Sequence, residues 1–439
     1  MATSSDATYN ALSRTIYHKV DIYLDGNNAD PLSVTKDNYM ITTSLLEEAT
    51  SGDTPFDGVS SNEISINLHN LHSIFTPTNT TSIYYGKMKR GVKIIPYFRT
   101  SLTDDWGQIG TFYITNWAAT PTSNIAVVTA NDKLYNIFSQ DAVDMPVSSN
   151  TTVSSFYTSF FALFNIVPVV DSSVTATLSK AFNELGNKEF LSALSSAFLC
   201  LCNCAHNGSV TIKELATTQA LRATITDADQ VKTIDVKLSI SSDYDSAYLK
   251  YYVPQESAEG SVLNINALSL NSTDSTLIYT LNNKPLIQFK SISFNNDTTL
   301  LTFISALATS KTITINLADI PDNTVTSLNV NGVYLEKVGY EIGTQGENPL
   351  TIDSVYIQDT QSAINYKTIM DRFASSLTPI IQASIKGNPN FQIGDKIQLI
   401  STRYGVNFTG ILMRQHFDYD GGLSCTITLL NSALVEVTT

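Results

Sequence analysis

Residues 110–117 read GTFYITNW, and residues 129–134 read TANDKL. The first stretch is rich in β-branched and aromatic residues, which favour strands. The second ends a strand expected over Ile125–Ala130 and begins a short helix expected over Asp132–Ser139. Together they predict two neighbouring strands followed by a helix.

The strand pattern extends upstream of these residues. Apolar and polar residues alternate there with the period of two that is typical of strands. Turn-forming residues separate the strands, for example between Thr103 and Gly107. Strands are expected at Tyr17–Leu24, Glu63–Leu68 and Lys93–Arg99. The N-terminal part of the chain therefore predicts a β-barrel or meander.

A second set of strands is expected at the other end of the chain. Residues 387–397 read GNPNFQIGDKI and residues 420–423 read DGGL, and both stretches contain turn-forming residues. A helix over Asp359–Ser376 precedes them. Strands are expected at Phe391–Ile400, Tyr404–Met413 and Ser424–Leu430. Because the two ends resemble each other, two copies of one barrel are a hypothesis.

The pattern changes between the two ends. From Ser154 to Cys204 the apolar residues, Leu178 among them, fall at helical spacing, and Gly186-Asn187 is an expected helix stop. Further on, Val231–Leu238 alternates like a strand, and short strands with Asn and Asp turns follow over Ser261–Thr351. We therefore expect a helical insertion and, after it, a β-sandwich-like module.

Composition limits the classes of protein. A chain of 439 residues and 47.9 kDa predicts two to four domains. Only 15% of residues are charged, and the net charge is −14. Nucleic-acid binding needs clustered Lys and Arg, and the densest basic run, Lys87, Lys89, Arg90 and Lys93, is short. Specific nucleic-acid binding is therefore disfavoured. No signal peptide or membrane span is expected, which predicts a chain made in a reducing cytoplasm.

Three of the four cysteines, Cys200, Cys202 and Cys204, form a cluster near His206. Zinc sites usually take their ligands from two separate pairs, and no second Cys/His pair occurs here. Two interpretations stay open, a metal site and buried thiols in the tail of an apolar helix, and the second is favoured.

Other candidate catalytic or metal residues have simpler explanations. His69 and His72 lack the Glu and the spacing of a zinc-protease helix. Asp104 and Asp105 are adjacent in a turn before Trp106-Gly107, so that a solvated corner is favoured over a pair of catalytic carboxylates. Asp418, Asp420, Gly421 and Gly422 have no bidentate Glu at calcium-loop spacing, so that a hairpin turn is favoured. No catalytic, cofactor-binding or metal site is predicted.

Several short motifs occur in a definite order along the chain. They are PFDG at 55–58, NEI at 62–64, YYG at 84–86, the 110–134 region, FLSAL at 190–194, NGSV at 207–210 and residues 387–397. This order resembles the baseplate-hub or tail-tip hub proteins of tailed phages and related contractile injection systems. Residues 257–344 match nothing in the family's pattern and are interpreted as a lineage-specific insertion.

The resemblance implies a mainly β fold with α insertions (α+β), which contains two tail-tube-like β-barrel domains. The implied domains are a first barrel at residues 1–145, a helical insertion returning by a hairpin at 146–215, a β-rich middle module at 216–350, and a helix plus a second barrel portion at 351–439. With two barrels per chain, a homotrimer would present six similar positions.

The resemblance also implies a function and partners. The trimeric ring would adapt a sixfold tail tube to a threefold central spike or tip, and it would line the channel for DNA or effectors. The implied partners are the tail tube protein, the tape-measure protein, the spike or tip protein and other baseplate proteins. The implied location is the virion, after assembly in the cytoplasm of the host bacterium. No enzymatic activity and no cofactor are expected.

Two competing functions remain at this stage. The first is a tail-tip adhesin whose middle β-module binds a cell-surface glycan, with Tyr244, Tyr248, Tyr251 and Tyr252 as candidate sugar platforms. Packing of these tyrosines at a domain seam is the simpler interpretation. The second is a wall-degrading enzyme, for which the chain offers no residue set.

Overall fold

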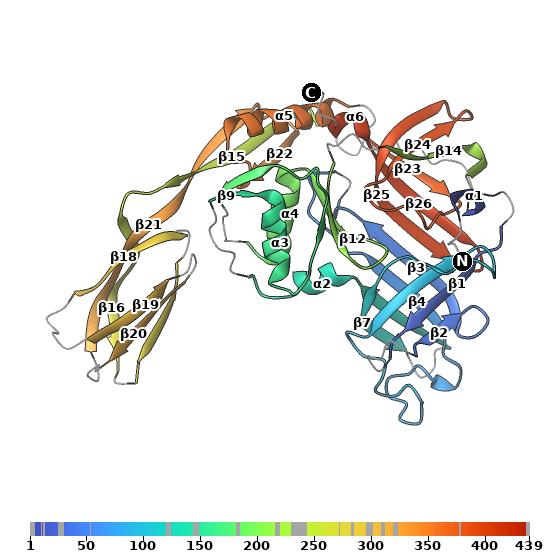
Figure 1. Cartoon of the computed structure of the whole chain (residues 1–439), viewed down its shortest axis with the longest axis horizontal. Coiled ribbons are helices and arrows are strands. Elements are labelled where there is room, and N and C mark those ends of the chain that lie inside the picture. Colours follow the sequence, from blue (N-terminus) through green and yellow to red (C-terminus); the bar gives the residue numbers. More distant parts are fainter. Residues whose placement is uncertain are drawn as a thin grey trace.

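The computed structural model describes most of the chain. The described ranges are residues 5–9, 11, 14–24, 30–52, 54–119, 124–143, 149–180, 185–215, 220–229, 244–271, 273–281, 285–295, 302–308, 312–318, 324–376 and 379–435. Within them the protein is rich in strands, which form several sheets, and helices lie between the strand sets (Figure 1). The expectation of a mainly β fold with helical insertions is confirmed at this level.

The largest sheet has 13 strands, drawn from both ends of the chain. Its N-terminal strands are β1 (Tyr17–Ile22), β2 (Leu32–Thr35), β3 (Met40–Glu48), β4 (Glu63–His69), β5 (Lys93–Arg99), β6 (Gly107–Gln108), β7 (Phe112–Ala119) and β8 (Ile125–Asn131). Its later strands are β14 (Leu221–Ile225), β23 (Ile380–Ile385), β24 (Lys396–Ser401), β25 (Val406–Tyr419) and β26 (Leu423–Asn431). The strands expected around residues 17–24, 63–68, 93–99, 110–117, 125–130 and 424–430 are confirmed.

The two strand sets meet at one antiparallel pair, β3 with β25. In its register Glu47 lies opposite Gln415, and Thr43 lies opposite Tyr419. The main path of the sheet runs β14-β24-β25-β3-β4-β8-β7-β5-β1-β2, and β26 links β23 to β25. Strand β3 was not expected from the sequence. It makes the N-terminal and C-terminal strands one continuous sheet.

Helices and short strands follow the N-terminal strand set. They are α2 (Lys133–Phe138), β9 (Ser149–Thr152), α3 (Val153–Ala162), β10 (Val169–Val170), β11 (Thr177–Lys180), α4 (Asn187–Ala197), β12 (Cys200–Cys204) and β13 (Val210–Glu214). Aromatic rings hold the two longer helices together, since Phe160 stacks on Phe190 with 4.9 Å between ring centroids. The expected helix at 132–139 and the aromatic helical faces are confirmed.

Three expectations in this region are wrong. Leu178 lies in β11 rather than in a helix, and Cys200–Cys204 form a buried strand rather than a helix tail. Gly186-Asn187 begins α4 instead of ending a helix. The reasons are tertiary. Strand β11 pairs with β9 and strand β12 with β13. At the start of α4 the buried Asn187 side chain contacts the carbonyl oxygens of Ile137, Gln140 and Asp141 at 3.0–3.2 Å.

A two-stranded arm leads away from the main body to a distal module (Figure 1). The elements are β15 (Ser246–Glu256), β16 (Gly260–Leu270), β17 (Thr276–Thr280), β18 (Leu286–Asn295), β19 (Thr302–Ala308), β20 (Thr312–Ala318), β21 (Thr324–Gly343) and β22 (Pro349–Ser354). Strand β21 spans both parts, because its C-terminal half pairs with β15 and its N-terminal half with β16 and β18. The strands expected at 275–281, 286–294 and 311–317 are confirmed, whereas Val231–Leu238 lies outside the described residues.

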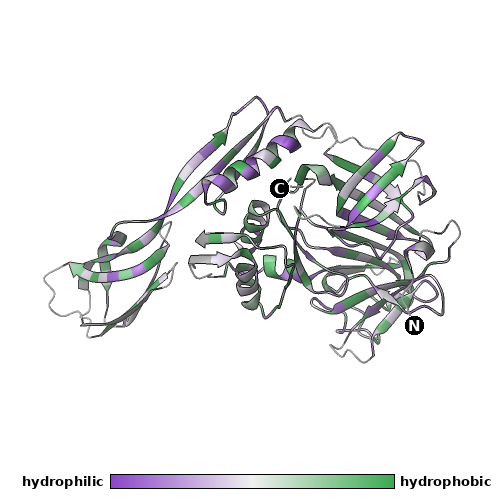
Figure 2. Ribbon diagram, turned by 45° about the horizontal axis from the view of Figure 1, so that its top comes forward, coloured by the Kyte–Doolittle hydropathy of each residue, from purple (hydrophilic) through white to green (hydrophobic). Residues whose placement is uncertain are grey.

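The described residues form two separate hydrophobic cores. One spans the large sheet, the helical segment and the base of the arm. The other lies between the β16–β21–β18 and β17–β20–β19 sheets and includes Ile313, Ile315 and Leu328. Helix α5 (Thr360–Ser375) lies along the arm and carries both hydrophilic and hydrophobic residues (Figure 2). The distal module thus has its own core at the end of a braced arm.

The short remaining elements are α1 (Asp6–Tyr9), α6 (Ser432–Val435) and the 3-10 turns Leu71–Ser73 and Asp227–Asp229. The strand expected over Phe391–Ile400 begins only at Lys396. Residues 391–395 form a turn instead, in which the Asp395 carboxylate accepts from the Gln392 backbone N–H at 2.9 Å and Gly394 has a φ of 89°. None of the helices in the described ranges is both long and apolar enough to cross a membrane.

Candidate functional site

The cysteine cluster lies on one face of a buried strand. Cys200, Cys202 and Cys204 alternate with other residues along β12, so that their side chains share a side. Burial, the largest effect, raises the pKa of all three thiols. Neutral thiols are poor metal ligands. No group of three or more His, Cys, Asp or Glu suited to a metal occurs within the described ranges.

The other candidate residues lie in turns. His69 ends β4 and His72 lies in a 3-10 turn, and both are exposed. The Asp104 carboxylate accepts from Thr100 Oγ1 at 3.1 Å within the turn after β5. Asp420 lies in the tight β25–β26 turn, where it pairs with Lys36 at 2.7 Å. The structure therefore brings none of these residues together.

The tyrosines proposed as sugar platforms belong to the arm. Tyr251 is only 3% exposed, stacks on Tyr340 at 5.5 Å and lies 3.2 Å from Thr360 of α5 through its hydroxyl group. For Tyr251 the simpler interpretation, packing at a seam, is confirmed, because this side chain packs between the arm and α5. Tyr252 donates to Asp353 of the neighbouring strand β22 at 3.2 Å.

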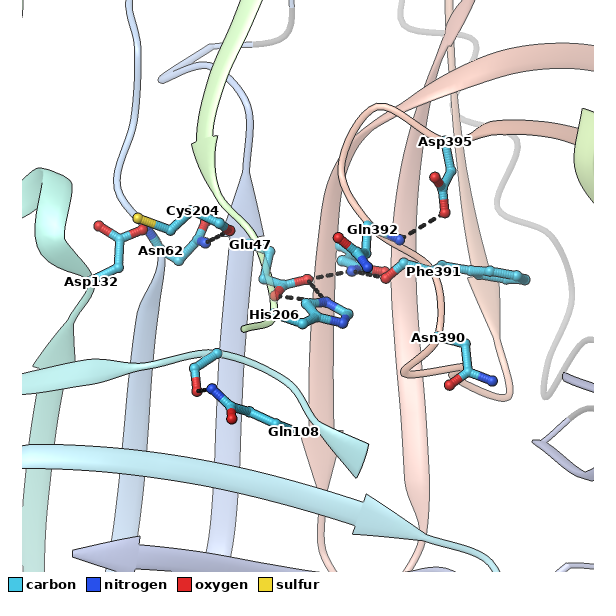
Figure 3. A network of polar contacts seen from close by, with 12 residues as sticks. Glu47, Asn62, Gln108, Asp132, Cys204, His206, Asn390, Phe391, Gln392 and Asp395 are labelled. Atoms are coloured by element: carbon cyan, nitrogen blue, oxygen red, sulfur yellow. Dashed lines mark hydrogen bonds and ion pairs between the residues drawn. The ribbon is translucent and has the colours of Figure 1, made fainter. Parts of the chain in front are cut away.

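A buried polar junction occurs where the two ends of the chain meet (Figure 3). It centres on Glu47 of β3, whose carboxylate contacts His206 Nε2 at 3.1 Å and accepts from the Gln415 side-chain amide. Gln415 Nε2 also donates to the Phe391 carbonyl oxygen at 2.8 Å. Glu47 is 2% exposed, His206 8% and Gln415 0%. The sequence did not predict this junction, because its three side chains come from distant segments.

Electrostatics explain the state of His206. Burial, the largest single effect, disfavours the imidazolium ion, but the adjacent Glu47 carboxylate and the charge of Asp395 together outweigh it. Their balance raises the pKa of His206 above its usual value. Gln415 contributes one unsatisfied atom, since its buried Oε1 has no hydrogen-bond partner among the described residues. Apart from this atom, the three side chains satisfy one another, and satisfied buried polar contacts of this kind favour one arrangement of the strands.

A second polar group lies beside this junction. Asp132 caps α2 by accepting from the Leu134 N–H at 2.9 Å, and it also accepts from the Asn62 N–H at 2.9 Å. Asn62 donates from its side chain to the Cys204 carbonyl oxygen at 3.2 Å. Burial, the largest effect, raises the pKa of Asp132 to about 6. These contacts fix β12 against the N-terminal strands.

A pocket of about 550 Å³ lies over the junction. The N-terminal segment, β6, the His206 turn, β14 and the 389–392 loop form its walls. Figure 3 shows His206 between Gln108 on one side and Asn390 and Gln392 on the other. The pocket therefore joins segments from both ends of the chain.

The comparisons with known proteins rest on structure. No protein-family model matches the chain, and no curated protein is similar to it in sequence. The 43 kDa tail protein of prophage MuSo2 from Shewanella oneidensis is similar in structure, with 9% identity, coverage of 96% of this chain and 100% of that chain, and a TM-score of 0.55. The tail protein from Neisseria meningitidis MC58 is also similar, with 8% identity, coverage of 95% and 97%, and a TM-score of 0.53.

These likenesses extend over nearly the whole of each chain. The protein therefore shares its fold with tail proteins, one of them from a prophage. The resemblance to phage tail proteins that the order of motifs indicated is confirmed at the level of the fold.

Proposed function

We propose that this protein is a structural hub of a phage tail or tail-like injection particle. The likeness in fold to two tail proteins along the full chain supports this role most strongly. In the proposed assembly three copies form a ring that adapts a sixfold tail tube to a threefold central spike or tip. The ring lines the channel through which DNA or effectors pass, and the protein turns over no substrate.

The pairing of β3 with β25 supports the proposal of two barrel-like units per chain. This pair sets the strands of both ends side by side, so that each copy can present two neighbouring strand sets. Three copies would then offer six positions to a tube above. The proposed partners are the tail tube, tape-measure and spike or tip proteins, together with other baseplate proteins. The net charge of −14 suits a channel to which DNA does not adsorb.

Imaging of the intact particle tests this role. Tail particles carrying the tagged full chain are expected to show three copies at the tube–spike junction in cryo-electron microscopy. A different copy number, or a position away from that junction, contradicts the proposal. A peptidoglycan zymogram of the purified chain is expected to stay uncleared.

The side chains on the distal module support a second candidate function, in which the protein is a tail-tip adhesin that binds a glycan. Its outer face carries neutral side chains that bridge three strands: Ser261 lies 2.7 Å from Asn329, and Asn331 lies 3.3 Å from both Asn329 and Ser291. Neutral amides and hydroxyls suit polyhydroxylated ligands, since they exchange hydrogen bonds without desolvating an ion.

Deletion of the distal module can distinguish between the two candidate functions. Glu256 and Leu335 lie opposite each other, so that a two-residue turn can replace residues 257–334. If the module binds glycan, the full chain is retained on purified cell-wall polysaccharide and the deleted chain is not. If the module is only peripheral to a hub, neither chain is retained and both enter particles.

A further inference from the structure

The pocket above the polar junction already holds one carboxylate. Asp6 accepts from Arg222 Nη1 at 2.6 Å, from Asn390 Nδ2 at 2.9 Å and from Asn388 Nδ2 at 3.1 Å. Burial opposes ionisation of Asp6, but these three donors together lower its pKa below the usual value. This wall of the pocket therefore has the donor geometry that recognises a carboxylate.

Two further polar groups that line the same pocket have no hydrogen-bond acceptor among the described residues. His206 uses only Nε2 to contact Glu47, and its Nδ1 has no hydrogen-bond partner among the described residues. Because Glu47 does not line the pocket, the opposite side of this ring faces the cavity (Figure 3). The half-buried side-chain amide of Gln392 also lines the pocket, and no partner for it occurs in the described part of the chain.

The protonation state of His206 decides what these two groups can bind. The Glu47 carboxylate stabilises the imidazolium form of His206, in which Nδ1 carries a proton and donates. The positive charge of Arg222 at the wall is already paired with Asp6 at 2.6 Å, and Asp6 is the one carboxylate among the described residues that line the pocket. A carboxylate at these two groups would therefore be held by hydrogen bonds to the imidazolium ion and to Gln392 rather than by unpaired charge on the wall.

We propose that this pocket binds a second carboxylate, held between His206 Nδ1–H and the side-chain amide of Gln392. The volume of about 550 Å³ admits a small organic acid or an acidic side chain of a neighbouring polypeptide. Both sources share the same chemistry. The inference goes beyond the structural role and does not rest on it.

The test uses the full chain labelled with ¹⁵N-histidine, followed by NMR at about pH 6. Acetate is expected to shift the His206 imidazole signals saturably with a dissociation constant in the millimolar range, whereas its neutral analogue acetamide is not. Gln392→Leu is expected to weaken acetate binding by about tenfold, the loss of one charge-assisted hydrogen bond. The exposed Gln361→Leu on α5 is the matched control and should bind like the parent.

A second arm identifies the source of the carboxylate. Binding of the capped tripeptide acetyl-Gly-Glu-Gly-amide at least tenfold more tightly than acetate supports an acidic side chain of a partner. Equal or weaker binding supports a small acid. The proposal is overturned if acetate gives no saturable shift, if acetamide shifts the signals equally, or if the Gln392→Leu variant, shown to be folded, binds like the parent.

Discussion

Arg414 and Glu48 lie opposite each other on β25 and β3, and the guanidinium group contacts the carboxylate at 3.1 Å although 366 residues separate the two in sequence. The pair is partly buried, with side chains 30% and 14% exposed. It lies next to the buried Glu47–Gln415 pair. The point where the two ends of the chain join is thus specified by charged and polar groups as well as by backbone hydrogen bonds.

A double-mutant cycle should measure the coupling between these residues. With Arg414→Met and Glu48→Gln we expect a coupling energy of about 1–2 kcal/mol in the free energy of unfolding, because the pair is partly shielded from water. The exposed Lys36–Asp420 pair, 44% and 75% exposed, is the control and should give less than about 0.5 kcal/mol. Urea denaturation provides the values, and equal coupling in both pairs would contradict this account.

Buried His18 should make the protein less stable in mild acid. Burial, the largest effect, lowers its pKa from 6.5 to about 4, although His18 lies 2.9 Å from the Tyr97 carbonyl oxygen through Nδ1. Between these values the unfolded chain binds the proton and the folded chain does not, so that stability falls as the pH decreases from 6.5 to about 4. The full effect is about 3 kcal/mol.

The His18→Gln variant should lose this part of the pH dependence. Urea denaturation at a series of pH values from about 7 to about 4 compares the two proteins. If their stabilities fall in parallel over that range, His18 does not contribute as argued.

Gly332 and Gly260 are cross-strand partners with opposite tolerance for a side chain. A Cβ atom at Gly332 would lie 2.6 Å from the Gln288 carbonyl oxygen and 2.4 Å from Leu286, whereas at Gly260 the nearest atom is 3.8 Å away. Gly332→Ala should therefore destabilise the distal module by about 1–3 kcal/mol. Gly260→Ala should change its stability by less than about 0.5 kcal/mol.

Calorimetry can locate this effect, because the distal module has its own core. We expect Gly332→Ala to lower the melting transition of the module and to leave that of the main body in place. An equal shift in both glycine variants would show that the close approach of β18 does not decide the outcome.

Asn187 should be essential for the helical segment. Its buried side chain accepts from the Val143 N–H at 3.0 Å and donates to the carbonyl oxygens of Ile137 in α2 and Asp141 in the loop after it. Asn187→Leu leaves these groups unsatisfied, with an expected cost of about 2–4 kcal/mol in the free energy of unfolding. The exposed Asn365→Ala on α5 is the control, with an expected cost below about 0.5 kcal/mol. Similar losses in both variants would contradict the role of Asn187.

Regular alternation made most strands predictable from the sequence. Leu221–Ile225 and Met40–Glu48 did not stand out, and β3 is the strand that joins the two ends. Residues 40–48 read MITTSLLEE, in which neither an apolar run nor strict alternation is complete. The buried Glu47 carboxylate in this strand is tolerated because His206 and Gln415 contact it. Both partners lie far from Glu47 in sequence, so that the residues around Glu47 give no local sign of these contacts.

The same limit applies to the candidate site. The sequence marked the cysteines and His206 as a cluster, yet it could not indicate that His206 turns toward Glu47. It assigned a helix tail to Cys200–Cys204, because an apolar run next to helical spacing does not distinguish a buried strand from a helix. Pairing with β13 decided the outcome there.

The pairing of β3 with β25 also affects how the chain is made. During synthesis on a ribosome, one edge of β3 stays without its partner until the residues around Arg414 emerge, 366 residues after Glu48. At about 5–20 residues per second this interval lasts about 20–70 seconds. An unpaired strand edge is a template for pairing with other chains, so that the nascent chain is open to intermolecular pairing at this edge throughout that time.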